Sequence, residues 1–141
     1  MLTVFLTVIS GTLIFVSGQI INKFIIEPIH NQSKIIGEVS DTLIFYANII
    51  HSPGFVGIEK EKILHEKLRE LASRLLTKSD MIKGYSFFQK IGIVIEKSNI
   101  SDAYHGLIGL SNEFPASKNT KLERIRKRYD DIKQKLNLKI D

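Results

Sequence analysis

The sequence predicts an all-α protein with one N-terminal transmembrane helix followed by a small cytosolic helical bundle of about five helices. The first 22 residues carry no charged side chain, and roughly 20 apolar helical residues suffice to cross a membrane. Farther along, apolar residues recur at three- and four-residue steps, the period of amphipathic helices. One β-branched stretch, residues 91–95, resembles a strand, but the chain offers no second strand to pair with it.

Charge and composition divide the chain into three segments. We expect an anchor helix over residues 1–27, a helical domain over 28–117 and a basic amphipathic C-terminal helix over 118–141. Residues 1–117 carry 11 basic and 11 acidic side chains, whereas residues 118–141 carry 9 basic and 4 acidic ones, so the net charge of +5 arises in the last segment. The chain has no cysteine, which excludes disulfides, thiolate metal sites and a cysteine nucleophile.

The opening stretch, MLTVFLTVISGTLIFVSGQIIN, favours a retained membrane span over a cleaved signal peptide. A signal peptide needs a positively charged start, and only the α-amino group precedes this apolar run, which is also long for such a peptide. A weak cleavage pattern at Val16-Ser17-Gly18 keeps that alternative open. A buried soluble helix is disfavoured, because a helix apolar on all sides needs a larger core than this chain can build.

Basic residues near the span predict its orientation. No Lys or Arg precedes the span, whereas Lys23 and Lys34 follow it closely. Since basic residues beside a span favour the cytoplasmic side, we expect the N-terminus outside and the domain in the cytoplasm.

Small and polar side chains gather on one face of the predicted span, among them Thr7, Gly11 and Gly18. Small residues let helix backbones approach closely in lipid, so this face predicts a contact with a second copy or with a partner membrane helix. The alternative is chance, because Gly, Ser and Thr are common in membrane helices.

Two amphipathic helices are expected after the span. Pro28 predicts a kink or break, since proline cannot donate to the helix ladder. Apolar positions from Ile35 to Ile50 then indicate a helix of about 20 residues, ended by a Pro-Gly turn. A second helix covers roughly 57–78, with its charged residues, Glu61 among them, on solvated faces.

The second half of the domain predicts a short helix at about 84–91, an extended segment, and a helix at about 100–113. Asn99 is the expected N-cap of the latter helix, which must end near Pro115. Aromatic residues with flanking lysines occupy 83–90, where they either rest in the membrane interface or fill the helical core.

The C-terminal segment combines an apolar seam with a basic cluster. The seam is too narrow for a fully buried helix, so it is expected to dock along the protein's own bundle or along a second copy. The basic cluster could attract anionic lipid on the cytoplasmic leaflet or nucleic acid, or form a solvated face balanced by nearby carboxylates. The seam comprises Leu122, Ile125, Tyr129, Ile132 and Leu136, and the cluster comprises Arg124, Arg126, Lys127 and Arg128.

No pattern for catalysis or for binding a metal or cofactor is present. His65-Glu66 begins a zinc-protease pattern, but Arg69 stands where the second histidine is required. Gly106 and Gly109 lie within a helical pattern, where they allow close helix packing rather than form a phosphate loop.

Four stretches in sequence order, FIIEPI (24–29), TLIFYANII (42–50), LRELASRL (68–75) and GLIGLSN (106–112), resemble a family of small uncharacterised bacterial single-pass membrane proteins with no assigned activity. The resemblance implies the bacterial inner (plasma) membrane and an all-helical cytosolic part. It supplies no catalytic residue and does not extend into the C-terminal helix.

These observations lead to the expectation of a membrane-anchored, non-enzymatic interaction or assembly protein. The alternative is a membrane-tethered nucleic-acid-binding or regulatory module that uses the basic C-terminal helix. Expected partners are the lipid bilayer, a second copy or partner span, and anionic lipid at the C-terminal helix.

Overall fold

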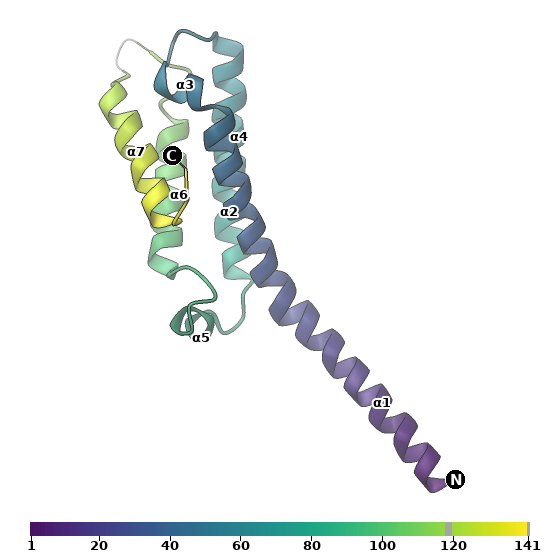
Figure 1. Ribbon diagram of the computed structural model, residues 1–141. Coiled ribbons are helices and arrows are strands. Elements are labelled where there is room, and N and C mark those ends of the chain that lie inside the picture. The colour runs from purple at the N-terminus through teal and green to yellow at the C-terminus, as the bar shows by residue number, and fades with distance from the viewer. Residues whose placement is uncertain (118–119, 141) are drawn as a thin grey trace.

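The computed structural model describes residues 1–117 and 120–140, and these ranges contain helices and no strand, which confirms the all-α prediction (Figure 1). A continuous run of helix comprises α1 (Leu2–Ile21), a π-helical turn η1 (Asn22–Ile26) and α2 (Glu27–Phe45). The remaining helices are α3 (Ala47–His51), α4 (Ile58–Asp80), α5 (Tyr85–Lys90), α6 (Lys97–Ser111) and α7 (Leu122–Lys135).

The N-terminal helix α1 projects from the bundle (Figure 1). None of its 20 residues is buried. It belongs to a helical run that is long and apolar enough to cross a membrane, and the apolar window of that run has no buried residue. The prediction of a helix of spanning length near the N-terminus is therefore confirmed.

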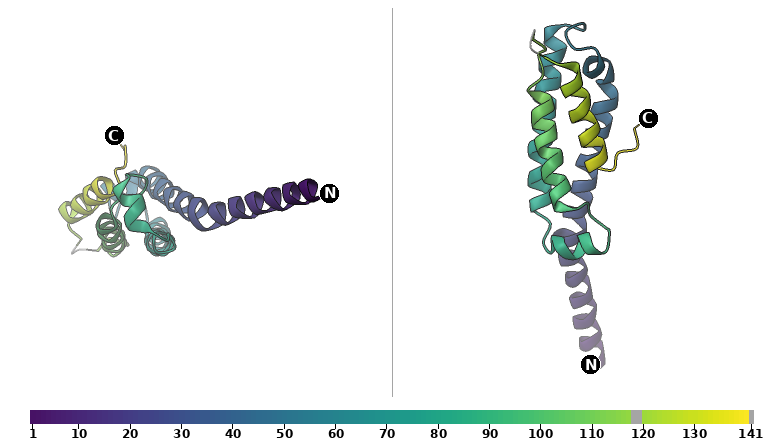
Figure 2. Two further views of the ribbon diagram at one scale, coloured as in Figure 1. Left: turned by 90° about the horizontal axis from the view of Figure 1, so that it is seen from below. Right: turned by 90° about the vertical axis from the view of Figure 1, so that its left-hand side faces the viewer.

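Pro28 bends the long helix rather than breaking it (Figure 2). A proline ring displaces the carbonyl four residues earlier and leaves it without a partner. Here the preceding turn widens, and the N–H of Glu27 bonds to the carbonyl of Asn22, five residues back. Such π turns accommodate an irregularity without ending the helix, so the break allowed by the sequence does not occur.

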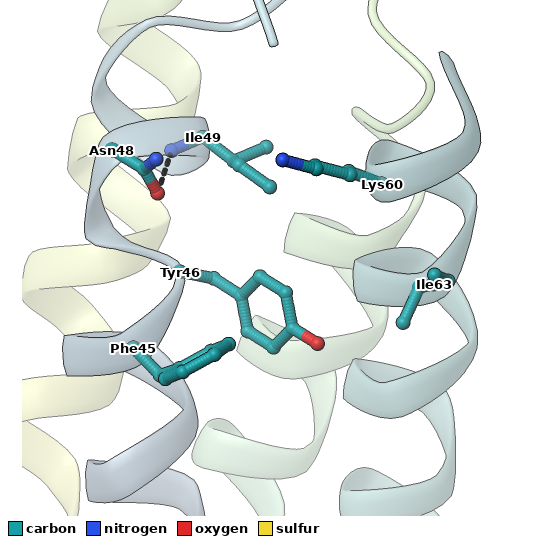
Figure 3. Close-up of a pocket in the computed structure, with 6 residues that line it drawn as sticks. All are labelled: Phe45, Tyr46, Asn48, Ile49, Lys60 and Ile63. Atoms are coloured by element: carbon teal, nitrogen blue, oxygen red, sulfur yellow. Dashed lines mark hydrogen bonds between the residues drawn. The ribbon is translucent and has the colours of Figure 1, made fainter. Parts of the chain in front are cut away.

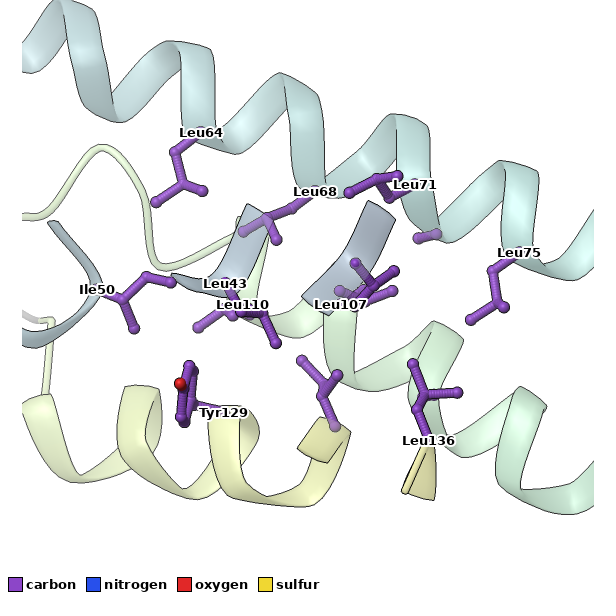
Figure 4. Close-up of a cluster of buried hydrophobic side chains, with 14 of the residues drawn as sticks. Leu43, Ile50, Leu64, Leu68, Leu71, Leu75, Leu107, Leu110, Tyr129 and Leu136 are labelled. Carbon is purple, nitrogen blue, oxygen red and sulfur yellow. The ribbon is translucent and has the colours of Figure 1, made fainter. Parts of the chain in front are cut away.

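One hydrophobic core holds the bundle together. α4 packs against both α2 and α6, α6 packs against α7, and α3 contacts α7 at the end away from α1 (Figures 1 and 2). Leucines and isoleucines from all these helices meet in the centre (Figure 4). Fully buried aliphatic residues of this kind each contribute roughly 1.5–3 kcal/mol by leaving water.

Two predicted helix boundaries are wrong. The helix expected to reach Ile50 is interrupted at Tyr46, whose backbone angles (φ −98°, ψ 15°) turn the chain into α3. Asn99 is not an N-cap, because α6 begins at Lys97, and its side-chain oxygen instead accepts a hydrogen bond from Lys135 Nζ at 3.4 Å. A contact with a distant helix thus takes the place of the expected local cap.

Close approach of α6 and α7 requires two glycines, in agreement with their predicted packing role. A Cβ atom at Gly106 would lie 2.9 Å from Cγ1 of Ile132. A Cβ atom at Gly109 would overlap the guanidinium group of Arg128. The two helices therefore meet with almost no space between the α6 backbone and the α7 side chains.

Gly106→Ala is expected to destabilise the bundle by about 1 kcal/mol, since overpacking costs roughly 1–3 kcal/mol and replacing a helical glycine by alanine returns about 1 kcal/mol. The matched control is Gly37→Ala in α2, where nothing lies within 4 Å. That variant should gain stability by up to about 1 kcal/mol. Urea unfolding followed by circular dichroism measures both, and equal stabilisation by the two changes would contradict the close packing of α6 on α7.

Candidate interaction surfaces

The apolar seam of α7 packs on the protein's own bundle. Ile125, Tyr129, Ile132 and Leu136 are buried in the main core, and Leu122 is half-buried. Figure 4 shows Tyr129 and Leu136 facing leucines of α4 and α6. Of the two partners that the sequence allowed, the seam thus uses the chain's own helices.

The predicted basic cluster is divided by an acidic side chain from the end of α6. Glu113, which is almost buried, lies 3.1 Å from a terminal nitrogen of Arg124 and 3.8 Å from Nε of Arg128. Arg126 and Lys127 are exposed, as is Arg124 despite its ion pair. Half of the cluster therefore helps to hold α7 against α6 rather than forming one continuous cationic surface.

The basic cluster also lies far from the end of the bundle where α1 leaves. It occupies the first turns of α7, which begin beside α3 at the opposite end (Figure 1). The 23 residues of α4 give the bundle a length of about 35 Å, whereas salt screens exposed charges beyond about 8 Å. A bilayer crossed by α1 would thus lie outside the range of these charges, and the anionic-lipid contact of α7 stays a prediction that this geometry does not favour.

The small-residue face of α1 is open. Its Thr7 hydroxyl donates to the carbonyl of Thr3 at 2.9 Å, so it is satisfied within its own helix. A Cβ atom added at Gly11 or Gly18 would meet nothing within 4 Å. The contact between spans through Thr7, Gly11 and Gly18 stays a prediction.

A groove of about 300 Å³ opens at the end of the bundle away from α1, between the α2–α3 corner and α4 (Figure 3). Its walls carry the exposed side chains of Phe45 and Ile63, with Lys60 above them. Phe55, from the connection that leads into α4, and Ile58, the first residue of α4, are also exposed. This end of the molecule therefore presents apolar side chains to its surroundings.

A second groove, of about 430 Å³, lies where the long helix enters the bundle. Lys23, Phe24 and Glu27 form one wall, and Met81 and Lys83 form part of the other. The ammonium group of Lys83 lies 5.1 Å from the ring centroid of Phe24, a cation–π contact across the groove.

Two buried polar side chains, Glu61 and Gln32, connect separate parts of the fold through hydrogen bonds. Glu61 was expected on a solvated face, but it is buried and accepts N–H groups of Gly54 (2.5 Å) and Ala116 (2.6 Å). The buried amide of Gln32 donates to the hydroxyls of Ser79 and Tyr85, both at 2.8 Å. Neither residue differs in local sequence from a solvated one, so only the fold reveals its role.

The pKa shifts of Arg74 and Tyr85 arise where these side chains contact other helices. Hydrogen bonding to Glu38 raises the pKa of Arg74, and burial raises the pKa of the Tyr85 phenol. His65 Nδ1 lies 2.7 Å from the carbonyl of Ser111, a contact between α4 and α6. In the part of the chain that the structure describes, no three His, Asp or Glu side chains are placed to hold a metal ion.

No family model matches this chain, and no match is found among curated proteins or solved structures.

Proposed function

We propose that this protein is a membrane-anchored, non-enzymatic interaction or assembly protein of the bacterial inner membrane, with its N-terminus outside and its bundle in the cytoplasm. The supporting observation is the continuity of the long helix. Its exposed apolar part, α1, runs without interruption into α2, whose Ile35, Val39 and Leu43 fill the core. The bundle would thus be held rigidly at the membrane instead of hanging on a flexible linker.

The exposed apolar side chains of the bundle support a role in binding. Its exposed apolar side chains gather at its two ends, around the Phe45 groove and on the connection from α4 to α6. By contrast, the side chains of Arg74, Glu61 and Gln32 form hydrogen bonds that hold parts of the bundle to one another. The bacterial location comes from the family resemblance, which covers most of residues 1–112.

The nucleic-acid alternative is less well supported. It needs the basic residues of α7 to be available together, and Arg124 and Arg128 are instead engaged with Glu113. Glu113 offsets part of the charge of this cluster even though the Arg124 side chain is 51% exposed, which reduces the net positive charge available for binding a phosphate backbone.

Single-cysteine labelling tests the anchor and its orientation, because the chain has no cysteine of its own. In intact cells stripped of their outer membrane, a membrane-impermeant maleimide should label Leu2→Cys and should label Phe55→Cys only after lysis. The positive-inside rule predicts this pattern from Lys23 and Lys34. The reverse pattern would overturn the orientation.

The intact mass of the membrane-extracted protein should include residues 1–18, since the start of the chain lacks the charge that a signal peptide needs. A mature chain that begins at Gln19 would instead remove the anchor, and the proposed function with it. Extraction at alkaline pH supplies the control, because a span resists it and a peripheral protein does not.

A further inference from the structure

The connection from α4 to α6, residues 81–95, turns large apolar side chains outward. Met81, Phe87, Ile91 and Ile93 are between 51% and 61% exposed. The same segment also turns apolar side chains inward: Ile82, Tyr85 and Val94 form a small buried cluster against Ile29 and Phe88. The segment is therefore two-sided, and its outer apolar side has no partner within the described chain.

This segment is held in place rather than loose. The Tyr85 hydroxyl accepts from Gln32 and donates to the carbonyl of Ile95, each at 2.8 Å, so α5 is tied to α2 and to the chain just before α6. An ion pair of 3.1 Å between Asp80 and Lys97 joins the two ends of the connection. The outward side chains are thus presented by a fixed element.

The segment lies at the end of the bundle from which α1 leaves, as Figures 1 and 2 both show. Lys83 reaches the ring of Phe24, three residues beyond the end of α1. Because that is the level at which the uncharged run ends, the outer face of residues 81–95 lies beside the height where a bilayer crossed by α1 has its headgroups.

The side chains of this face are of the kinds found at the headgroup level of a membrane. Lys83 and Lys90 flank the aromatic residues, and long basic side chains extend to phosphates while their aliphatic stems stay in the apolar layer. The groove between Phe24 and Met81 adds an apolar slot with Lys23 and Lys83 at its walls. Apolar side chains with flanking lysines characterise segments that lie in the interface plane.

We propose that residues 81–95 form a second membrane contact, in which Met81, Phe87, Ile91 and Ile93 enter the interface of the leaflet that the anchor helix leaves. The occupant of this face is the phospholipid surface, with Lys83 and Lys90 at its phosphates. This inference rests on the proposed membrane anchoring. It adds that the bundle docks on the bilayer with its α5 end, which directs the Phe45 groove away from the membrane.

The test uses the absence of tryptophan from the chain, so that each single-tryptophan variant reports one position. Three full-length variants are reconstituted into vesicles of two parts phosphatidylcholine and one part phosphatidylglycerol: Phe87→Trp in α5, Phe15→Trp in α1 and Phe55→Trp at the far end. Phosphatidylcholine brominated either high or deep in its acyl chains then quenches the fluorescence of any tryptophan that it touches.

Phe87→Trp should emit at shorter wavelength in vesicles and be quenched more by shallow than by deep bromines. Phe15→Trp should be quenched most by deep bromines, and Phe55→Trp should be unaffected. Adding Ile91→Asp and Ile93→Asp to Phe87→Trp should remove its quenching while the helical circular dichroism is retained, because only outward side chains change.

Quenching of Phe15→Trp without quenching of Phe87→Trp would overturn this second contact and leave the anchor intact. Loss of quenching at Phe15→Trp would remove the proposed membrane anchoring, and this inference with it. Equal quenching of Phe87→Trp and Phe55→Trp would also overturn the inference, as would shielding of Phe87→Trp from aqueous quenchers without lipid contact, which would indicate a protein partner.

Discussion

Ile132→Asp in α7 is expected to lower the free energy of unfolding of the bundle by at least about 4 kcal/mol. The Ile132 side chain is fully buried between α6 and α7. Its loss removes roughly 2–5 kcal/mol of packing, and a carboxylate at this position would have no partner to offset its lost hydration. Because small domains are stable by only about 5–15 kcal/mol, this change should bring the bundle close to unfolding.

Urea unfolding of the full-length protein in a mild detergent measures this loss, since the micelle keeps α1 helical and the signal change then reports the bundle. The matched control is Lys127→Asp, which places the same carboxylate on the exposed side of α7 and should alter stability by no more than about 0.5 kcal/mol. If Ile132→Asp left the bundle stable but separated associated chains, the seam of α7 would instead lie between two copies of the protein.

The sequence was sufficient to predict the span from its uncharged apolar length and the long bundle helices from the one regular face that each buries. The seam from Leu122 to Leu136 and the apolar positions of α4 repeat at the helical period, and the structure buries most of them. Boundaries were less predictable where a distant residue replaces a local one. Asn99, for example, accepts a hydrogen bond from Lys135 instead of capping its own helix. At Pro28 the reason is different, because the preceding turn widens and the helix continues.

The surfaces were harder to predict, because exposure depends on how the helices are placed. Phe87 and Phe88 are neighbours with the same side chain, yet Phe87 faces outward and Phe88 packs on the buried cluster around Tyr85. Of the two alternatives that the sequence allowed for this aromatic group, the core alternative therefore holds for Phe88, whereas the membrane interface stays a proposal for the outward Phe87. Similarly, no local feature of the basic cluster shows that Glu113 engages two of its four members.

Glu61→Leu is expected to destabilise the bundle by about 2–4 kcal/mol, although the leucine would be as buried as its neighbours. The Glu61 carboxylate, in the first turn of α4, receives the N–H of Gly54 from the preceding connection and the N–H of Ala116 from the connection between α6 and α7. Leucine accepts neither, and each N–H left without a partner costs about 1–3 kcal/mol. The expected loss lies in the lower part of the summed range because Gly54 and Ala116 are near enough to solvent for water to replace part of the bond.

The control for this change is Glu59→Leu, in the same turn of α4 but exposed. Both substitutions remove a negative charge that favours a helix N-terminus by about 0.3–1 kcal/mol, so the difference between them isolates the two hydrogen bonds of the Glu61 carboxylate. Glu61→Gln should fall between them, since its carbonyl oxygen can accept one N–H while its amide faces the other. Hydrogen exchange provides a second measurement: the amides of Gly54 and Ala116 should exchange faster in Glu61→Leu than in Glu59→Leu. Equal stability and equal exchange in the two leucine variants would show that water replaces the carboxylate and that other contacts hold both connections.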